Sequence, residues 1–153
     1  MENLKDTHQE KIIKTMEMSL SEKDIKGLNP LVLAYIGDAV YEVHIRKYLV
    51  NIQKTGVNQL HKKATQFVKA KAQATIVHYL MDTLTEEEIT IVKRGRNSKS
   101  NTSPKNANIS DYHYATGYEA LVGYLYLMKR QERLANIIAQ SIEFIERQIE
   151  DRL

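Results

Sequence analysis

Two acidic residues, Asp38 and Glu119, interrupt apolar segments of the chain and could support metal chemistry there. Asp38 lies within the apolar segment 31–41, directly after Gly37, and Glu119 lies within a second apolar segment, 115–127. An ionised carboxylate among apolar neighbours loses hydration, which is costly unless a cation compensates. Each acid could instead be structural and pair with a basic side chain or a tyrosine hydroxyl. Composition alone gives the two interpretations about equal weight.

The two carboxylates together indicate a metal and a reaction class. Oxygen ligands favour Mg²⁺, which keeps several of its waters and needs only one or two carboxylates plus a substrate phosphate. A divalent ion held in this way can activate water and neutralise the charge that develops on a phosphodiester. We therefore expect Asp38 and Glu119 to be both catalytic residues and metal ligands, with Mg²⁺ as cofactor and Mn²⁺ able to replace it. The small residues expected to let the two segments approach are Gly37, Ala39, Gly117, Ala120 and Gly123.

Other catalytic chemistries have little support in the sequence. The chain has no cysteine, so thiolate nucleophiles, thiolate metal sites and disulfides are excluded. Its five histidines lack metal-ligand spacing such as HExxH, and no nucleotide-binding loop of the type GxxxxGKS/T or GxGxxG is present. We therefore expect no organic cofactor.

Positive charge is segregated along the chain. Residues 43–81 contain seven Lys or Arg and no acid, and residues 89–110 contain five Lys or Arg and no acid. These stretches carry +12 together, while the formal net charge of the whole chain is only +3. Such segregation indicates a basic surface for a polyanion such as nucleic acid. The alternative for either stretch alone is an ordinary solvated lysine face.

The elements that must position these residues are expected to be helices. Only two prolines and six glycines are present, and the alternation typical of strands is scarce. Asn29 followed by Pro30 predicts a helix start, and a helix so apolar on nearly every side is expected to be central in the fold. Thr85 and Glu88 have the spacing of a capping box. The expected helices are residues 30 to about 50, 58 to 80, 85 to about 94, 110 to about 128, and a last one over about 134–149, with a polar basic loop at 95–109.

The length of 153 residues fits one domain. Residues 1–25 are expected to form a weak helix or a mobile N-terminal arm, and residues 26–153 the domain. No apolar run is long enough to span a bilayer, and charged residues stand where a signal peptide would have its apolar core. We expect a soluble, cytoplasmic protein with no membrane partner.

Several segments resemble those of a known enzyme family. The segment 33–40, LAYIGDAV, resembles the signature helix of the ribonuclease III catalytic domain, and 119–127, EALVGYLYL, resembles the second acidic helix of that domain. Three further segments, at 60–64, 93–97 and 102–107, are similar to the stand-alone bacterial family called Mini-ribonuclease III. The resemblance runs from about residue 28 to residue 134.

The resemblance implies an all-α ribonuclease III catalytic domain, a helical bundle over residues 26–153. It implies a homodimer whose two sites cut both strands of an RNA duplex and leave 5′-phosphates. The double-stranded-RNA-binding domain of ribonuclease III is expected to be absent. The implied substrate is the precursor of large-subunit (23S) ribosomal RNA, and a large-subunit ribosomal protein is a further partner that the resemblance allows.

The resemblance also gives the basic stretches a role in binding the duplex. A-form RNA is recognised largely through its shape, its phosphates and its 2′-hydroxyls. Neutralising Arg94 and Arg96 is therefore expected to weaken RNA binding and flatten its salt dependence. The residues expected to contact RNA are Lys62, Lys63, Arg94, Arg96, Asn97, Lys99, Lys105 and Asn106.

The sequence departs from ribonuclease III at three positions where that family has acids. Leu31, Ala34 and Thr116 stand there instead, so only Asp38 and Glu119 supply carboxylates. The number of metal ions per site is therefore left open. A second hypothesis is also left open, namely a non-catalytic protein with the same fold that binds double-stranded RNA or the ribosome.

Overall fold

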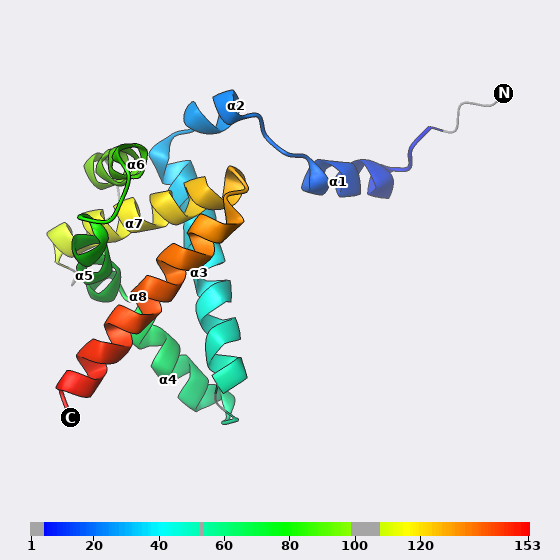
Figure 1. The fold of residues 1–153 in the computed structure, drawn as a ribbon. Coiled ribbons are helices and arrows are strands. Elements are labelled where there is room, and N and C mark those ends of the chain that lie inside the picture. The colour runs from blue at the N-terminus through cyan, green and yellow to red at the C-terminus, as the bar shows by residue number, and fades with distance from the viewer. Residues whose placement is uncertain (1–4, 53, 99–107) are drawn as a thin grey trace.

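The computed structural model describes residues 5–52, 54–98 and 108–153, and within them the chain is helical, with no strand (Figure 1). No helix in these ranges is long and apolar enough to cross a membrane. The all-helical prediction is confirmed. The helices are α1 (His8–Glu17), α2 (Glu22–Lys26), α3 (Pro30–Ile52), α4 (Val57–Val68), α5 (Ala70–Leu80), α6 (Glu86–Asn97), α7 (Ile109–Leu127) and α8 (Gln131–Asp151).

Helices α3 and α7 cross at the centre of the molecule (Figure 1). The start of α3 is fixed as predicted, because the Asn29 side chain accepts a hydrogen bond from the backbone N–H of Leu31 at 2.8 Å. Asn108 caps α7 in the same way, accepting from the N–H of Asp111 at 3.2 Å. Around this crossing, α4, α5, α6 and α8 bury their apolar faces in one core. The two helices that carry Asp38 and Glu119 are therefore held by packing on several sides.

The second predicted helix is wrong in one respect, because residues 57–80 form two helices rather than one. Lys69 takes an extended conformation, with φ −61° and ψ 151°, and separates α4 from α5. No glycine or proline marks this break. A side chain supports it, since Gln73 Nε2 donates to the carbonyl of Val68 at 2.9 Å. That carbonyl lies at the end of α4, where helical partners are lost.

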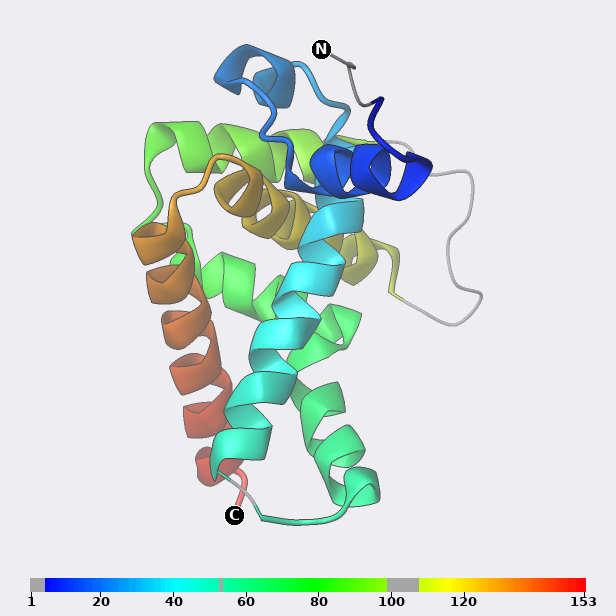
Figure 2. The same ribbon diagram turned by 90° about the vertical axis from the view of Figure 1, so that its right-hand side faces the viewer.

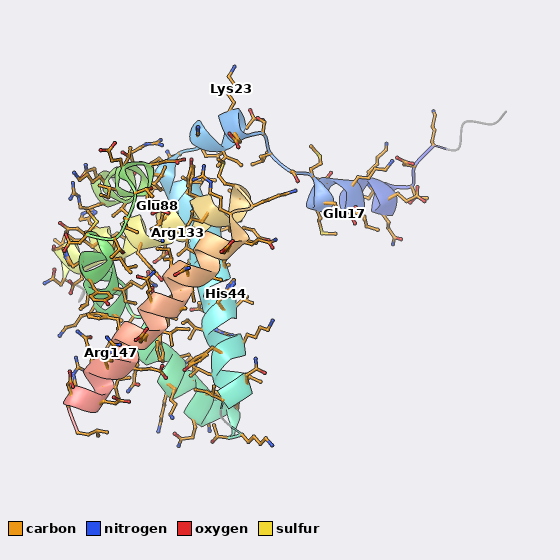
Figure 3. All side chains as sticks on the ribbon, viewed as in Figure 1. Glu17, Lys23, His44, Glu88, Arg133 and Arg147 are labelled. Carbon is orange, nitrogen blue, oxygen red and sulfur yellow. The ribbon has the colours of Figure 1, made fainter. Side chains whose placement is uncertain are left out.

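The capping box predicted at the start of α6 is confirmed. The Thr85 hydroxyl accepts from the Glu88 N–H at 3.2 Å, and Glu88 Oε1 accepts from the Thr85 N–H at 2.9 Å. The Glu88 side chain is only 3% exposed and also pairs with Arg133 of α8 at 2.8 Å (Figure 3). One glutamate thus caps α6 and ties it to α8.

The N-terminal helices differ in how they join the domain. Ile25 of α2 is 1% exposed and belongs to the core. Helix α1 has a complete capping box at Thr7 and Glu10 but buries no residue, and it stands off the domain on the side of α3 (Figures 1 and 2). The division into an arm and a domain at residue 25 stays a prediction.

Helix α3 is central, but one of its sides is open. Val32, Tyr35, Val43 and Val50 are 45%, 79%, 63% and 59% exposed. Together with the exposed Ala39 they follow helical spacing along a single face. In Figure 2 this helix faces the viewer, with α1 in front of its upper end. We call residues 32, 35, 39, 43 and 50 the α3 stripe.

Candidate active site

Two glycines bring the backbones of α3 and α7 into contact at their crossing. A Cβ added at Gly37 would lie 1.7 Å from the Glu119 carbonyl oxygen, and one added at Gly123 would lie 1.9 Å from the Leu33 carbonyl oxygen. Backbone atoms cannot yield to such contacts, so only glycine fits at either position. Because Asp38 directly follows Gly37, and Gly37 contacts Glu119, the crossing places the two carboxylates beside one another.

The other small residues predicted to aid this approach lie elsewhere. A Cβ at Gly117 would lie 2.6 Å from the Val92 carbonyl oxygen, so Gly117 allows α6 rather than α3 to approach α7. Ala120 is buried, and it too faces α6 through Gly95. Ala39 is exposed on the α3 stripe. The predicted close approach of the two acidic helices therefore depends on Gly37 and Gly123.

Asp38 and Glu119 line one hollow of about 650 Å³ between α3, α7 and the junction of α4 with α5. Asp38 is exposed at this hollow, while Glu119 is half-buried. Much of the remaining wall is apolar or uncharged. Its other residues are Leu31, Ala34, Tyr35, Ile36 and Ala39 from α3, Val68, Ala70 and Gln73 from the α4–α5 junction, and Tyr112, Ala115 and Thr116 from α7.

Neither carboxylate has a cation partner in the described part of the chain. No hydrogen bond or ion pair from these residues reaches Asp38 or Glu119, although arginines neutralise other acids. Burial, followed by the charges of Asp38 and Glu42, raises the pKa of Glu119 to about 8. Burial and Glu42 also raise the pKa of Asp38. Two adjacent acids that repel each other and lack a protein cation fit a divalent metal ion.

Glu42 is a part of this site that the sequence interpretation missed. It lies one helical turn after Asp38, on the same helix, and its carboxylate pairs with Arg46 at 2.8 Å. Its charge nevertheless raises the pKa of both Asp38 and Glu119. The four-residue spacing from Asp38 was the available signal, because residues four apart share a helix face.

The three positions at which the sequence departs from ribonuclease III supply no carboxylate to the site. Leu31, Ala34 and Thr116 all line the hollow. The Thr116 hydroxyl donates to the Tyr112 carbonyl at 3.0 Å, as is common for a threonine inside a helix. Within residues 5–52, 54–98 and 108–153, no group of three or more His, Cys, Asp or Glu is placed to hold a metal. Most ligands of an ion at this site would therefore be waters or substrate oxygens.

The five predicted RNA-contact residues that the structure describes lie on two helices outside the wall of the hollow. Lys62 and Lys63 are exposed on α4, and Arg94 is exposed on α6, where it makes a long 3.4 Å contact to the Leu28 carbonyl. Arg96 is half-buried and lies over the Tyr114 ring, 5.5 Å from its centre. Its Nε donates to the side-chain oxygen of Asn97, which is exposed, at 3.1 Å. Lys99, Lys105 and Asn106 lie outside the described residues.

Arg96 contacts a tyrosine on α7, the helix that also carries Glu119. Tyr114, on which it stacks, belongs to the same turns of α7 as Tyr112, Ala115 and Thr116, which line the hollow. The guanidinium lies within the range of a cation–π contact with this ring, which favours one position of the side chain. Helix α6 therefore presents a positioned cation beside the acidic hollow.

The chain is similar to known proteins in both sequence and fold. The family described as Ribonuclease III domain matches residues 31–130. The Mini-ribonuclease 3 of Clostridium tetani is 55% identical over 82% of this chain and 84% of its own length. The Mini-ribonuclease 3 of Staphylococcus aureus is 44% identical over 81% of this chain and 94% of its own length. A crystal structure of a Fusobacterium nucleatum protein is similar with a TM-score of 0.71 and 36% identity, covering 78% of this chain and 96% of that one.

Proposed function

The chain belongs to the ribonuclease III family, and on that premise we propose that Asp38 and Glu119 form the catalytic centre of its endoribonuclease activity on double-stranded RNA. The enzyme class is that of the family, an endoribonuclease of the ribonuclease III type. One observation carries the assignment of the site. Two adjacent carboxylates share a hollow, have raised pKa values and lack a cation from the described chain.

Asp38 and Glu119 are the residues that would hold a divalent ion, which we take to be Mg²⁺ with Mn²⁺ as a substitute. A bound ion supplies charge neutralisation at the phosphodiester and an activated water. Glu119 must lose its proton to take part, because its pKa of about 8 leaves it protonated at neutral pH without an ion. Asp38 is the more exposed of the two carboxylates, and we assign it to the side of the site from which the phosphate enters. Glu42 adds further negative charge near Asp38 and Glu119, and this charge favours the binding of a cation between these two residues.

The basic side chains on α4 and α6 support binding of the duplex. Lys62, Lys63 and Arg94 are exposed, and Arg96 is positioned over Tyr114. We propose that they, with Asn97, contact phosphates and 2′-hydroxyls on either side of the hollow. We assign the same role to Lys99, Lys105 and Asn106.

The α3 stripe supports a homodimer. Five residues on one helix face, four of them large and apolar, are open to solvent in the single chain. Two of them, Tyr35 and Ala39, also line the hollow. Pairing of two stripes therefore buries an apolar surface and places two hollows at the edges of one interface, where they can act on the two strands of a duplex.

The dimer is tested by placing one charge on the stripe. Val43→Glu should give a chain with the mass of a monomer, because an acid at the centre of an apolar interface loses its hydration without a partner. Ile109→Glu is the matched control, since Ile109 is also 63% exposed but lies at the start of α7. Light scattering after gel filtration measures the mass of both. A monomeric parent protein, or a dimer that persists in Val43→Glu, would contradict the assignment.

We propose further that the natural substrate is the precursor of large-subunit (23S) ribosomal RNA, matured in the cytoplasm, with a large-subunit ribosomal protein able to present the stem. The support is the similarity to proteins named Mini-ribonuclease 3. Stems copied from both ends of the precursor should be cut at defined positions. Random duplexes of equal length should be cut more slowly, and equal rates would remove this part of the proposal.

Cleavage of duplex RNA tests the assigned site. The parent protein should cut with Mg²⁺ and not without it, while Asp38→Asn and Glu119→Gln should be slower by about 1,000-fold, since a metal ion stabilises the transition state by several kcal/mol. Retained binding of the duplex by both variants would show that only chemistry was lost. A parent protein that binds the duplex but leaves it intact in Mg²⁺ would instead favour the RNA-binding protein without catalysis.

A further inference from the structure

Gln73 carries a buried oxygen for which the described residues supply no donor. Its side chain is 2% exposed, and Nε2 donates to the Val68 carbonyl at 2.9 Å, but Oε1 has no hydrogen-bond partner. A carbonyl only accepts, so the amide is held with its nitrogen toward Val68 and its oxygen turned elsewhere. Among the described residues it is the sole buried side-chain oxygen or nitrogen left in this state. Leaving a buried acceptor unpaired destabilises a fold, so the group calls for an explanation.

The position of Gln73 explains why its oxygen has no donor within the described chain. It lies in the first turn of α5 and lines the same hollow as Asp38 and Glu119. Its neighbours along that wall are apolar, with Val68 and Ala70 on the α4–α5 junction and Ala34 on α3. A donor for Oε1 can therefore come from whatever fills the hollow.

Resting on the proposed function, the chemistry of duplex RNA identifies that donor. Phosphate oxygens only accept hydrogen bonds, and the amino groups that paired bases leave free lie in the grooves, farther from the backbone than the ribose hydroxyls. The ribose 2′-hydroxyl can donate, and it is the group by which a protein distinguishes RNA from DNA. We propose that Gln73 Oε1 accepts a hydrogen bond from one 2′-hydroxyl of the strand that occupies the hollow.

A neutral acceptor suits this place better than a carboxylate would. Asp38, Glu119 and Glu42 already repel one another enough to raise pKa values in the hollow. A further acid would add to that repulsion and would also oppose the phosphate next to the ribose. An amide oxygen accepts a hydrogen bond from the hydroxyl without adding charge, so Gln73 acts as a residue that determines specificity for ribose over deoxyribose.

Single 2′-deoxy substitutions, moved along a short RNA duplex, test the proposal. Binding is measured by fluorescence anisotropy in EDTA, so that no strand is cut. The parent protein should bind between about 2-fold and about 12-fold more weakly when one particular nucleotide of each strand lacks its hydroxyl, the range expected for one neutral hydrogen bond. Gln73→Met, which keeps the volume but removes the acceptor, should abolish that loss at the same nucleotide.

Gln140→Met is the matched control. Gln140 is half-buried on α8, and its Nε2 donates to the Asn136 side chain at 3.2 Å, away from the wall of the hollow. This variant should keep the full sensitivity of the parent protein to the missing hydroxyl.

The proposal is overturned by any of three results. If Gln73 only supports the α4–α5 junction, Gln73→Met weakens binding of the all-ribose duplex and of the 2′-deoxy duplex equally. The ratio of the two affinities then stays that of the parent protein. If no nucleotide is sensitive in the parent protein, the proposal fails even if no variant folds. Gln73→Met could instead weaken Mn²⁺ binding without RNA and leave the ratio of affinities for the all-ribose and 2′-deoxy duplexes unchanged. The oxygen would then accept a hydrogen bond from a water bound to the ion. A parent protein that binds no duplex RNA contradicts the proposed function itself.

Discussion

Glu88 and Glu119 are two glutamates on neighbouring helices that the fold treats in opposite ways. Burial raises the pKa of Glu88, but Arg133 and the backbone at Thr85 outweigh it, and the pKa is lowered overall. Burial raises the pKa of Glu119 to about 8, and the charges of Asp38 and Glu42 add to the shift. Figure 3 shows Glu88 and Arg133 side by side, with α6 and α8 supplying one partner each.

The difference separates an acid that stabilises the fold from one that is kept for chemistry. At Glu88 each oxygen has protein donors, so its charge is compensated within the chain. At Glu119 the described chain supplies a like charge in place of a counter-charge. A pKa raised by burial and by a neighbouring acid within a hollow is typical of functional carboxylates.

The comparison predicts opposite changes in stability when each glutamate is neutralised. Glu88→Gln should lower the free energy of unfolding by about 2–3 kcal/mol, because Arg133 loses its counter-charge and the cap weakens. Glu119→Gln should cost nothing at pH 8 or should stabilise the protein, since it removes an uncompensated charge. Urea titrations at pH 8 in EDTA measure both.

Glu143→Gln is the control for Glu88→Gln. Glu143 also pairs with an arginine, Arg147, but both side chains are more than half exposed. Exposed pairs contribute little, so the loss should stay below about 0.5 kcal/mol. Equal losses at Glu88 and Glu119 would remove the distinction between the two acids.

The pH dependence of stability should also differ between the two acids. The pKa of Glu119 is higher in the folded chain than its ordinary value of 4.5, so between about 4.5 and about 8 the folded state binds the extra proton. Its contribution to stability is therefore full below 4.5 and declines as pH rises toward 8. The lowered pKa of Glu88 acts in the other direction, with stability lost only as the solution becomes acidic.

Unfolding measured from pH 6 to pH 8 in EDTA checks the sign. The parent protein should lose on the order of 1 kcal/mol over this range from Glu119, an amount reduced by the partial exposure of the carboxyl. Glu119→Gln should flatten the decline, and Glu88→Gln should leave it in place. A decline that persists unchanged in Glu119→Gln would show that another group titrates.

The smallest predicted effect comes from Glu42. Glu42→Gln removes one of the like charges on Glu119 and should move the pH midpoint of Mn²⁺ binding downward by less than about one unit. Glu143→Gln is again the control, since it breaks the same kind of i,i+4 pair on α8. A midpoint that moves upward, or moves equally in the control, would show that Glu42 does not act on this site.

The sequence was sufficient to predict the helices that carry the site. Asn29 with Pro30 and Thr85 with Glu88 are local signals, and local capping chemistry fixed those helix starts as expected. The close approach at Gly37 was predicted, because small residues in both apolar segments permit two helices to come near each other. The role of Gly117 was assigned to the wrong neighbour, because a small residue does not indicate which helix approaches it.

Other features depend on tertiary contacts that leave no local pattern. The break at Lys69 has no glycine or proline, and the amide of Gln73 that supports it lies four residues farther along the chain. The open side of α3 could not be separated from its buried side, since both are apolar. The influence of Glu42 on the site could not be predicted, because its charge acts on Glu119 across the crossing of two helices.

Mn²⁺ binding, followed by electron paramagnetic resonance at pH 8 without RNA, tests the central claim that Asp38 and Glu119 jointly hold a divalent ion. The parent protein should bind Mn²⁺, and Asp38→Asn and Glu119→Gln should each weaken binding by at least about tenfold. Even the mutation of a residue that only hydrogen-bonds to a metal ligand commonly lowers metal affinity by about that factor. Glu88→Gln, kept below its unfolding temperature, should bind as the parent does. Unchanged Mn²⁺ affinity in both Asp38→Asn and Glu119→Gln would contradict the account.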